Sequence, residues 1–352
     1  MKTMSVLRWV LAALMLLALT MVLSSPALAE VEPLPLDQLV PGQPAQEDGW
    51  TYVPAAEAGE GQMLLKYSSK TREWTVTDTA APVSAYDWAR YEDGSISVEV
   101  TFYTARPAYE PVNLPCAVVR IRIADPSQLR TTMSFDSYDK RDYVKAEDMS
   151  KHVNAIAAVN GDFFKYHYNV GYVVRQGVFY RDSLNGKRDL LLIDQNGDFH
   201  IVYAATSEAT ADTIAEMEQQ GLTVVNSFTL GPVLVENGQA RVIKETVVAE
   251  SGEFQWPYPQ QRVAICQIGP LEYAIVEAYG KTDSTAGMNM QEFADFIAFV
   301  LPDCQIAYNL DGGGSTNVMV NSTRIHKTPG ARKISDIIYF ASAYTDGSEN
   351  GD

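Results

Sequence analysis

The segment Ile96-Ser-Val-Glu-Val-Thr-Phe-Tyr103 decides the fold class, because apolar and polar residues alternate along it. The segment Ala117-Val-Val-Arg-Ile-Arg-Ile123 repeats this alternation shortly afterwards. An alternating pattern puts successive side chains on opposite faces of an extended strand. Both segments are therefore predicted to be half-buried strands of an antiparallel sheet.

Strand patterns continue on either side of this pair, whereas helical patterns are few. Helices are predicted over residues 207–220 and over residues 291–300, with Asn289 as the N-cap of the second, and a short helix over residues 147–152. Because the strands do not alternate regularly with helices, we expect an α+β fold, with a mixed, mainly antiparallel sheet core and a few packed helices. The further strands are expected at residues 155–159, 190–194, 199–203, 233–236, 262–268, 272–277, 306–310, 317–320 and 334–340.

The first 29 residues have the pattern of a secretory signal peptide. Lys2 and Arg8 flank the start of an apolar run, and Ala27-Leu28-Ala29 then provides the small-x-small cleavage pattern. A retained membrane anchor is the competing interpretation, but the apolar run is shorter than a spanning helix prefers. We expect cleavage after Ala29, no integral membrane segment in the mature chain, and a secreted or cell-envelope-associated protein of bacterial type.

Composition divides the remaining chain into four parts. Residues 30–60 are rich in proline with little periodicity, which predicts a Pro-rich arm and not a folded unit. Residues 61–145 are expected to form a strand-rich N-terminal part of the domain. Residues 146–345 contain the candidate site, and residues 346–352 are a tail.

The chain is acidic, with a formal net charge of −17. Signal cleavage would remove Lys2 and Arg8 but no acidic residue, which leaves −19. A field of this sign repels phosphate, so the chain is a poor partner for nucleic acid or anionic lipid, and no nucleic acid partner is expected. An anionic substrate would need local arginines and backbone N–H groups to overcome that field.

Cysteines are few, and none has the spacing of a zinc site. Cys116 and Cys266 lie in apolar, strand-like runs, which favours buried thiols. One disulfide and one free thiol among Cys116, Cys266 and Cys304 is the alternative.

The strongest candidate site is Asn309-Leu310-Asp311-Gly312-Gly313-Gly314-Ser315-Thr316, which directly follows an apolar strand. Three successive glycines cost conformational entropy on folding, and they permit positive φ and close approach to the main chain. Their N–H groups could form a small anion-binding concavity, with the Asp311 carboxylate at the strand end. A flexible hairpin loop with a capping aspartate is the alternative.

A second candidate segment is Asn160-Gly161-Asp162, which also follows a predicted strand. Asn160 and Asp162 have side chains that position hydroxyl groups, bind a cation, or act as acid or base. An Asn-Gly hairpin turn is the alternative for this segment.

These segments, in order, resemble the phosphodiester glycosidase family. The resemblance rests on Ala158-Val-Asn-Gly-Asp-Phe-Phe164, Phe228-Thr-Leu-Gly-Pro232, Arg262-Val-Ala-Ile265, the triglycine block and Arg332-Lys-Ile-Ser-Asp336, and it covers about residues 150–341. It implies that residues 146–345 are a phosphodiester glycosidase-like catalytic region. The implied reaction is hydrolysis of the bond between an anomeric sugar carbon and a phosphodiester oxygen.

The resemblance also implies roles for individual residues. Asp311 would be nucleophile, base or electrostatic stabiliser of an oxocarbenium-like transition state, with Asp162 or Asp283 as second carboxylate. The sugar phosphodiester would be bound by Asn160, Gly161, Arg262, Asn309, Gly312, Gly313, Gly314, Ser315 and Arg332, the arginines pairing with the phosphate. For the two arginines a structural ion pair is the alternative, and for Asp283 a loop cap.

Two other hypotheses fit the same residues. The first is a non-catalytic envelope protein whose pocket binds phosphosugars or carbohydrate. The second is a metal-dependent site in which Asp162, Asp311 and backbone carbonyls hold Ca²⁺. No cofactor is assigned from the sequence, and Ca²⁺ is the one candidate.

Overall fold

The two alternating segments form the middle of a large curved sheet. The computed structural model describes residues 28–40, 49–54, 63–79, 86–109, 112–165, 170–252, 256–280, 287–326 and 331–343. Within them, β5 (Ile96–Arg106) pairs antiparallel with β6 (Leu114–Ile123) along almost their whole length. Alternate residues of β5, such as Ile96, Val98 and Val100, are buried. The predicted half-buried antiparallel pair is confirmed.

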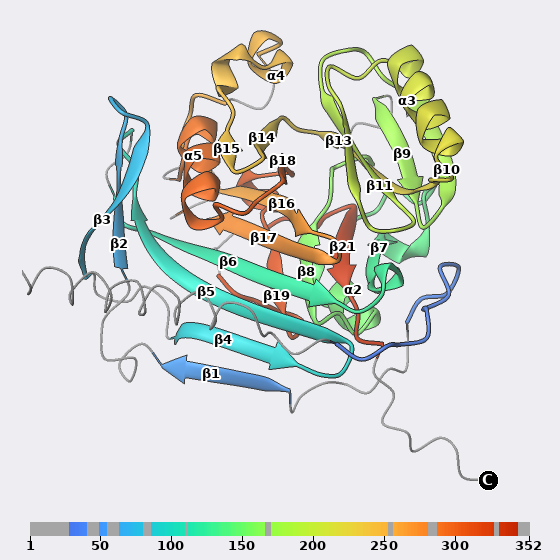
Figure 1. Ribbon diagram of the computed structural model, residues 1–352, viewed down its shortest axis with the longest axis horizontal. Helices are drawn as coiled ribbons and strands as arrows, with labels where there is room; N and C mark the ends of the chain where they lie inside the picture. The colour runs from blue at the N-terminus through green and yellow to red at the C-terminus, as the bar shows by residue number, and fades with distance from the viewer. Residues whose placement is uncertain are drawn as a thin grey trace, which may run out of the picture.

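Eleven strands of the described residues belong to this large sheet, which runs across the whole molecule (Figure 1). All its pairings are antiparallel except one, between β2 and β5. The order along the sheet is β1 (Trp50–Pro54), β4 (Tyr86–Glu92), β5, β6, β17 (Glu272–Ala278), β16 (Arg262–Gly269), β18 (Ile306–Asn309), β14 (Val233–Glu236) and β15 (Gln239–Ala240), and β2 (Met63–Ser68) joins β3 (Glu73–Thr79) to β5.

A five-stranded sheet packs against one face of the large sheet. Its order is β20 (Thr323–Arg324), β19 (Val318–Val320), β8 (Ala157–Asn160), β21 (Asp336–Phe340) and β7 (Leu129–Met133). The main core cluster combines Val263 and Leu310 of the large sheet and its following loop with Val159, Val318 and Ile338 of the smaller one. This shared core fixes the ends of β8 and β18 relative to each other.

Two small sheets complete the β structure, on the right of Figure 1. One contains β12 (Phe199–Val202), β11 (Asp189–Asp194) and β13 (Val224–Leu230), and the other pairs β9 (Gly171–Arg175) with β10 (Val178–Ser183). Helix α3 (Ser207–Gln219) covers the first, and Thr206 caps its N-terminus through the Ala209 N–H. The predicted helix over 207–220 is confirmed.

Helix α5 (Met290–Val300) covers the other face of the large sheet. Its Phe293, Phe296 and Ile297 side chains are fully buried there. Asn289 and Glu292 form a reciprocal capping box, in agreement with the predicted N-cap. The remaining helices are short: α2 (Ala146–His152), α4 (Val247–Glu250), and the 3₁₀ turns η1 (Pro126–Gln128), η2 (Ser134–Asp136), η3 (Ile243–Glu245) and η5 (Gly313–Ser315). Together these elements confirm the predicted α+β fold.

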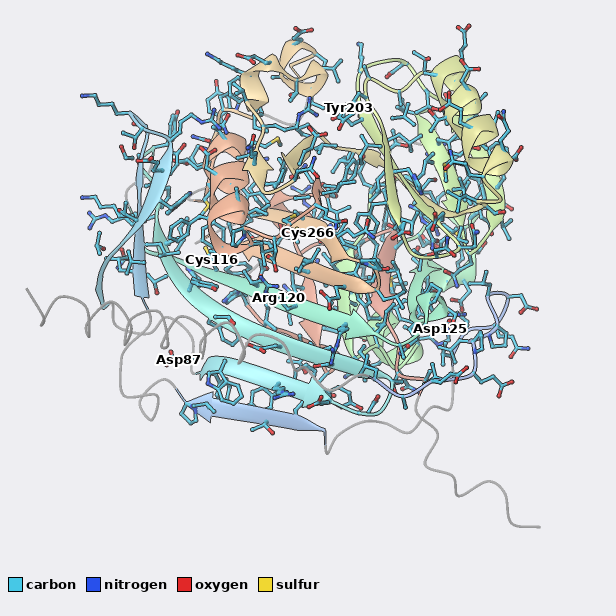
Figure 2. The ribbon with its side chains drawn as sticks, viewed as in Figure 1. Asp87, Cys116, Arg120, Asp125, Tyr203 and Cys266 are labelled. Carbon is cyan, nitrogen blue, oxygen red and sulfur yellow. The ribbon has the colours of Figure 1, made fainter. Side chains whose placement is uncertain are left out.

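The three cysteines are free and buried. Cys116 on β6 and Cys266 on β16 lie in the large sheet beneath α5 (Figure 2), and Cys304 belongs to the same core cluster. The prediction of buried thiols is confirmed, and the disulfide alternative is wrong for this structure.

The prediction that residues 30–60 form an arm without folded structure is wrong for their described part. Trp50–Pro54 is strand β1, paired with β4. The stretch from Leu34 to Gln38 is bound to the body, where the Leu34 N–H donates to Ser127 Oγ at 2.8 Å and Arg130 Nη2 donates to the Pro35 carbonyl at 2.8 Å. Composition alone did not reveal these long-range hydrogen bonds.

The predicted signal peptide falls on residues 1–29, of which 1–27 lie outside the described residues. Among the residues described, no helix has the length and apolar character needed to cross a membrane.

Candidate active site

Strand β8 of the five-stranded sheet and strand β18 of the large sheet end beside each other. Asn160, at the end of β8, forms hydrogen bonds with the loop that follows β18. Its Nδ2 donates to the Asp311 carbonyl at 2.8 Å, and its Oδ1 accepts from the Asn317 N–H at 2.9 Å. Asn160 is only 1% exposed. Its amide therefore holds the triglycine loop against the end of β8.

Gly312 and Gly313 are required by the main chain around them, whereas Gly314 lies against the Arg332 side chain. A Cβ on Gly312 would lie 2.7 Å from the Gln261 carbonyl oxygen, and one on Gly314 would lie 2.9 Å from Arg332 Nε. Gly313 has a φ of +59°, a conformation that favours glycine. The Gly313 N–H donates to the Gln261 carbonyl at 2.9 Å, so it is not available for the predicted anion-binding concavity.

The two loops line one pocket of about 860 Å³. It therefore contains both predicted segments, together with the chain around Arg332. Its lining residues are Tyr143, Asn160, Gly161, Asp162, Phe163, Asp311, Ser315, Arg332, Lys333, Ile334, Ser335 and Asp336. A pocket of this size accommodates a ligand of several hundred daltons.

Asp311 lies partly exposed in this pocket and is hydrogen bonded to Ser315. Burial raises the pKa of its carboxyl to about 7, and the negative charge of Asp162 adds to the effect. The Ser315 hydrogen bond and the charges of Arg332 and Arg188 oppose it. Asp311 consequently exchanges its proton close to neutral pH, which suits a group that acts in catalysis.

A buried cluster of three charged residues lies beside Asp311. Arg175 Nη2 donates to Asp162 Oδ1 at 2.9 Å and to Asp336 Oδ2 at 2.7 Å, and Arg175 Nε donates to Asp336 Oδ2 at 2.9 Å. All three side chains are at most 3% exposed. The Arg175 guanidinium thus donates hydrogen bonds to two carboxyl groups, and both acidic residues line the pocket.

Basic groups at the pocket offset its carboxylates. Arg332 and Lys333 are exposed at the rim, and the Arg332 N–H donates to the Gly314 carbonyl at 2.9 Å. Arg188, which is buried, stacks over the Phe163 ring at 5.6 Å from its centroid. These cations offset part of the negative charge of the carboxyl groups that line the pocket.

Several predicted site residues lie elsewhere. Arg262 is 2% exposed on β16, where its Nε donates to the Met288 carbonyl at 3.1 Å and its Nη2 to the Tyr258 carbonyl at 2.9 Å. Burial lowers the pKa of its guanidinium to about 10. It does not line the pocket, and this placement argues for a structural role in place of the predicted phosphate binding.

Asn309 does not line the pocket either, and its Nδ2 donates to the Gly231 carbonyl at 2.8 Å. Asp283 lies outside the described residues.

Sequence reasoning missed Arg175, Arg188 and Asp336 as members of the site. Arg175 ends an ordinary apolar strand, and Arg188 precedes one, so neither has a local signal. Asp336 is the last residue of the segment Arg332–Asp336, one of those on which the family resemblance rests. Its place in that segment is the signal that identifies it as a candidate site residue. The distance in sequence between Asp162, Arg175 and Asp336 hides their contact.

The pocket does not offer a good donor set for Ca²⁺. Both oxygens of Asp162 accept from N–H groups, Oδ1 from Arg175 and Oδ2 from the Thr229 backbone at 2.8 Å. Calcium needs six or more oxygen ligands that are free to turn toward it. Among the described residues, no cluster of three or more His, Cys, Asp or Glu side chains suits a metal. The geometry therefore gives no support to the calcium hypothesis.

Comparison with known proteins agrees with this geometry. The family model described as phosphodiester glycosidase matches residues 153–341, which is more than half of the chain and includes every described residue of the pocket except Tyr143. The chain belongs to the phosphodiester glycosidase family. The family assignment supports hydrolase activity. A search of curated proteins found no match.

A solved structure has a similar fold. The catalytic domain of zebrafish N-acetylglucosamine-1-phosphodiester alpha-N-acetylglucosaminidase, auto-inhibited by pro-peptide, is similar with a TM-score of 0.56 and 18% identity, over 70% of this chain and 84% of that one. A hypothetical protein from Synechocystis has a TM-score of 0.47 and 13% identity, over 70% of this chain and 62% of that one. At such identities the first match is evidence for the fold alone, and the second carries no weight.

Proposed function

We propose that this protein hydrolyses the bond between the anomeric carbon of a sugar and a phosphodiester oxygen. The observation that carries the proposal is the Asp311 carboxyl, bonded to Ser315, in a pocket whose rim holds Arg332. A carboxylate next to a cation matches a substrate that develops positive charge at carbon and releases a phosphate. The family assignment makes this the reaction of first choice.

The chemistry assigns a separate task to each group. The anomeric C–O bond breaks with its electrons going to the phosphate oxygen, and Asp311 in its ionised form stabilises the positive carbon as nucleophile or as charge. Arg332 pairs with the phosphate, whose negative charge persists on the leaving monoester. Water supplies the new hydroxyl of the sugar, so the products are the free sugar and a phosphate monoester.

Asp311 is poised for this task by its surroundings. A pKa of about 7 leaves about half of the protein with an ionised carboxylate at neutral pH. An incoming phosphodiester would be held by Arg332 on one side, and Ser315 would keep the Asp311 carboxyl in place. The free energy that opposes ionisation of Asp311 is recovered when positive charge develops at the sugar.

We further propose that the natural substrate is a sugar phosphodiester of a cell-envelope polymer or extracellular polysaccharide. The support is the secretory signal pattern at the N-terminus, since an exported hydrolase meets such polymers. Sugar phosphodiester linkages occur in teichoic-type polymers, which makes these polymers suitable test substrates.

The test is a panel of sugar-1-phosphodiesters with product analysis by NMR. Wild type is expected to release free sugar, and Asp311→Asn is expected to lose at least about 100-fold in kcat/KM. Asp212→Asn, a matched change on the exposed surface of α3, should behave as wild type. Tight binding without product release would support the non-catalytic alternative and refute the proposal. Loss of activity with a chelator, restored by Ca²⁺, would revive the metal hypothesis.

A further inference from the structure

The carboxyl groups of Asp162 and Asp336 both accept hydrogen bonds from Arg175, but they differ in how many of their oxygens are hydrogen bonded. Asp162 has both oxygens occupied, one by Arg175 and one by the Thr229 N–H. Asp336 receives both of its Arg175 hydrogen bonds on Oδ2. No described residue hydrogen bonds to its Oδ1. Of the two, only Asp336 therefore has an oxygen left for a ligand or a proton.

The position of Asp336 makes this oxygen relevant to the pocket. Asp336 begins β21, between β8 and β7, and it lines the same pocket as Asp311. Its carboxyl lies against Gly161, where a Cβ would be 2.5 Å from Oδ1 and 2.6 Å from Oδ2. Gly161 therefore has no side chain that could separate this carboxyl from the loop. Asn160, the residue before Gly161, donates to the main-chain carbonyl of Asp311. The Asn160-Gly161 segment therefore contacts both acidic residues.

Charge balance around Arg175 favours a proton on this oxygen. One guanidinium cannot neutralise two buried carboxylates, so the cluster carries an excess negative charge unless one carboxyl is protonated. Burial raises the pKa of Asp336, and the charge of Asp162 adds to this, whereas Arg175 and Lys165 oppose it. Because Oδ2 accepts two N–H groups, a proton on Asp336 must reside on Oδ1.

We propose that Asp336 is the second catalytic carboxyl of the site, with Oδ1 as the atom that gives and takes the proton. This inference rests on the proposed function. In the first half of the reaction the anomeric C–O bond breaks and the Oδ1 proton passes to the departing phosphate oxygen. In the second half a water oxygen bonds to the anomeric carbon and its proton returns to Oδ1. One water is consumed, and Asp336 ends as it began.

This assignment replaces the second carboxylate expected from the sequence. Asp162 then acts as a positioning residue, which accepts from the same Arg175 Nη2 as Asp336 and is itself held by the Thr229 N–H. The Arg175 guanidinium fixes the orientation of Asp336, so that Oδ1 points away from the donors.

The experiment measures kcat/KM against pH on the best sugar-1-phosphodiester for wild type, Asp336→Asn and Asp162→Asn. Wild type is expected to lose rate at alkaline pH, where Asp336 has lost its proton. Asp336→Asn is expected to lose at least about 100-fold and to lack the alkaline decline. Asp162→Asn is expected to fall in rate but to keep the decline, because neither Asp162 oxygen is free.

The outcomes separate this inference from the proposed function. A folded Asp336→Asn protein that stays within about tenfold of wild type, or that retains the alkaline decline, overturns the role of Asp336 while activity of the wild type stands. If circular dichroism shows that Asp336→Asn fails to fold, the wild-type profile decides: an alkaline decline supports the proposal, and a plateau overturns it. Absence of turnover by wild type removes the proposed function itself.

Discussion

Replacing Asp311 by asparagine should make the protein more stable at alkaline pH while it abolishes turnover. The pKa of Asp311 is raised by burial from its usual value of 3.8 to about 7. Below its unfolded-state pKa the carboxyl is protonated in both states and has no effect on stability. As the pH rises toward 7, the unfolded chain releases the proton and the folded chain keeps it, so stability is lost. Asparagine has no such penalty.

The size of the effect follows from the same two values. At about 1.4 kcal/mol for each pH unit, ionising Asp311 in the folded protein would cost up to about 4 kcal/mol. Near pH 5 about one third of the penalty should be present, and above about pH 8 all of it.

The assay is urea unfolding followed by circular dichroism near pH 5 and near pH 8.5. Asp311→Asn should exceed wild type by up to about 4 kcal/mol at the higher pH and by about one third of that at the lower one. Asp212→Asn, on the exposed face of α3, controls for the general loss of an acidic charge. An equal gap at the two pH values, or an Asp311→Asn protein less stable than wild type near pH 8.5, would refute the reasoning.

Three further predictions concern packing. Gly161→Ala should lower the free energy of unfolding by about 1–3 kcal/mol and lower activity, because the added methyl group would clash with the Asp336 carboxyl. Gly269→Ala is the control, since a Cβ there would meet its nearest atom only at 3.8 Å. Thermal melting should show Gly269→Ala to be as stable as wild type. His326→Ala should cost about 3 kcal/mol in urea unfolding, since it removes the 2.7 Å partner of the fully buried Glu277 carboxylate, and a cost below about 1 kcal/mol would contradict this. The three buried cysteines should resist thiol reagents in the native state and all react in denaturant, whereas one reactive thiol per denatured chain would show that a disulfide had formed.

Local patterns in the sequence were sufficient for much of the fold. The alternation in β5 and β6 and the capped apolar face of α5 are properties of neighbouring residues, so they could be predicted. β1 could not, since its proline-rich setting obscures the pattern and its partner β4 supplies the hydrogen bonds.

The candidate site was predictable only where its residues are close in sequence. The triglycine block and Asn160-Gly161-Asp162 each have a local signature, and the structure brings both to one pocket. Arg262 illustrates the limit, because its carbonyl partners come from Tyr258 and from Met288 on a separate segment. No local sequence pattern distinguishes an arginine that is buried and bonded to backbone carbonyls from one that is exposed and binds phosphate. The catalytic roles of these residues remain predictions.

The position of β21 governs when the pocket can exist. This strand is the last of the described strands in sequence, yet it lies inside its sheet, with β8 on one side and β7 on the other. Until it is inserted, β7 and β8 have no common neighbour, Arg175 lacks one of its two acids, and the Arg332 side of the pocket is missing. The pocket can therefore form only after the chain up to Phe340 has been made and β21 has taken its place between β8 and β7.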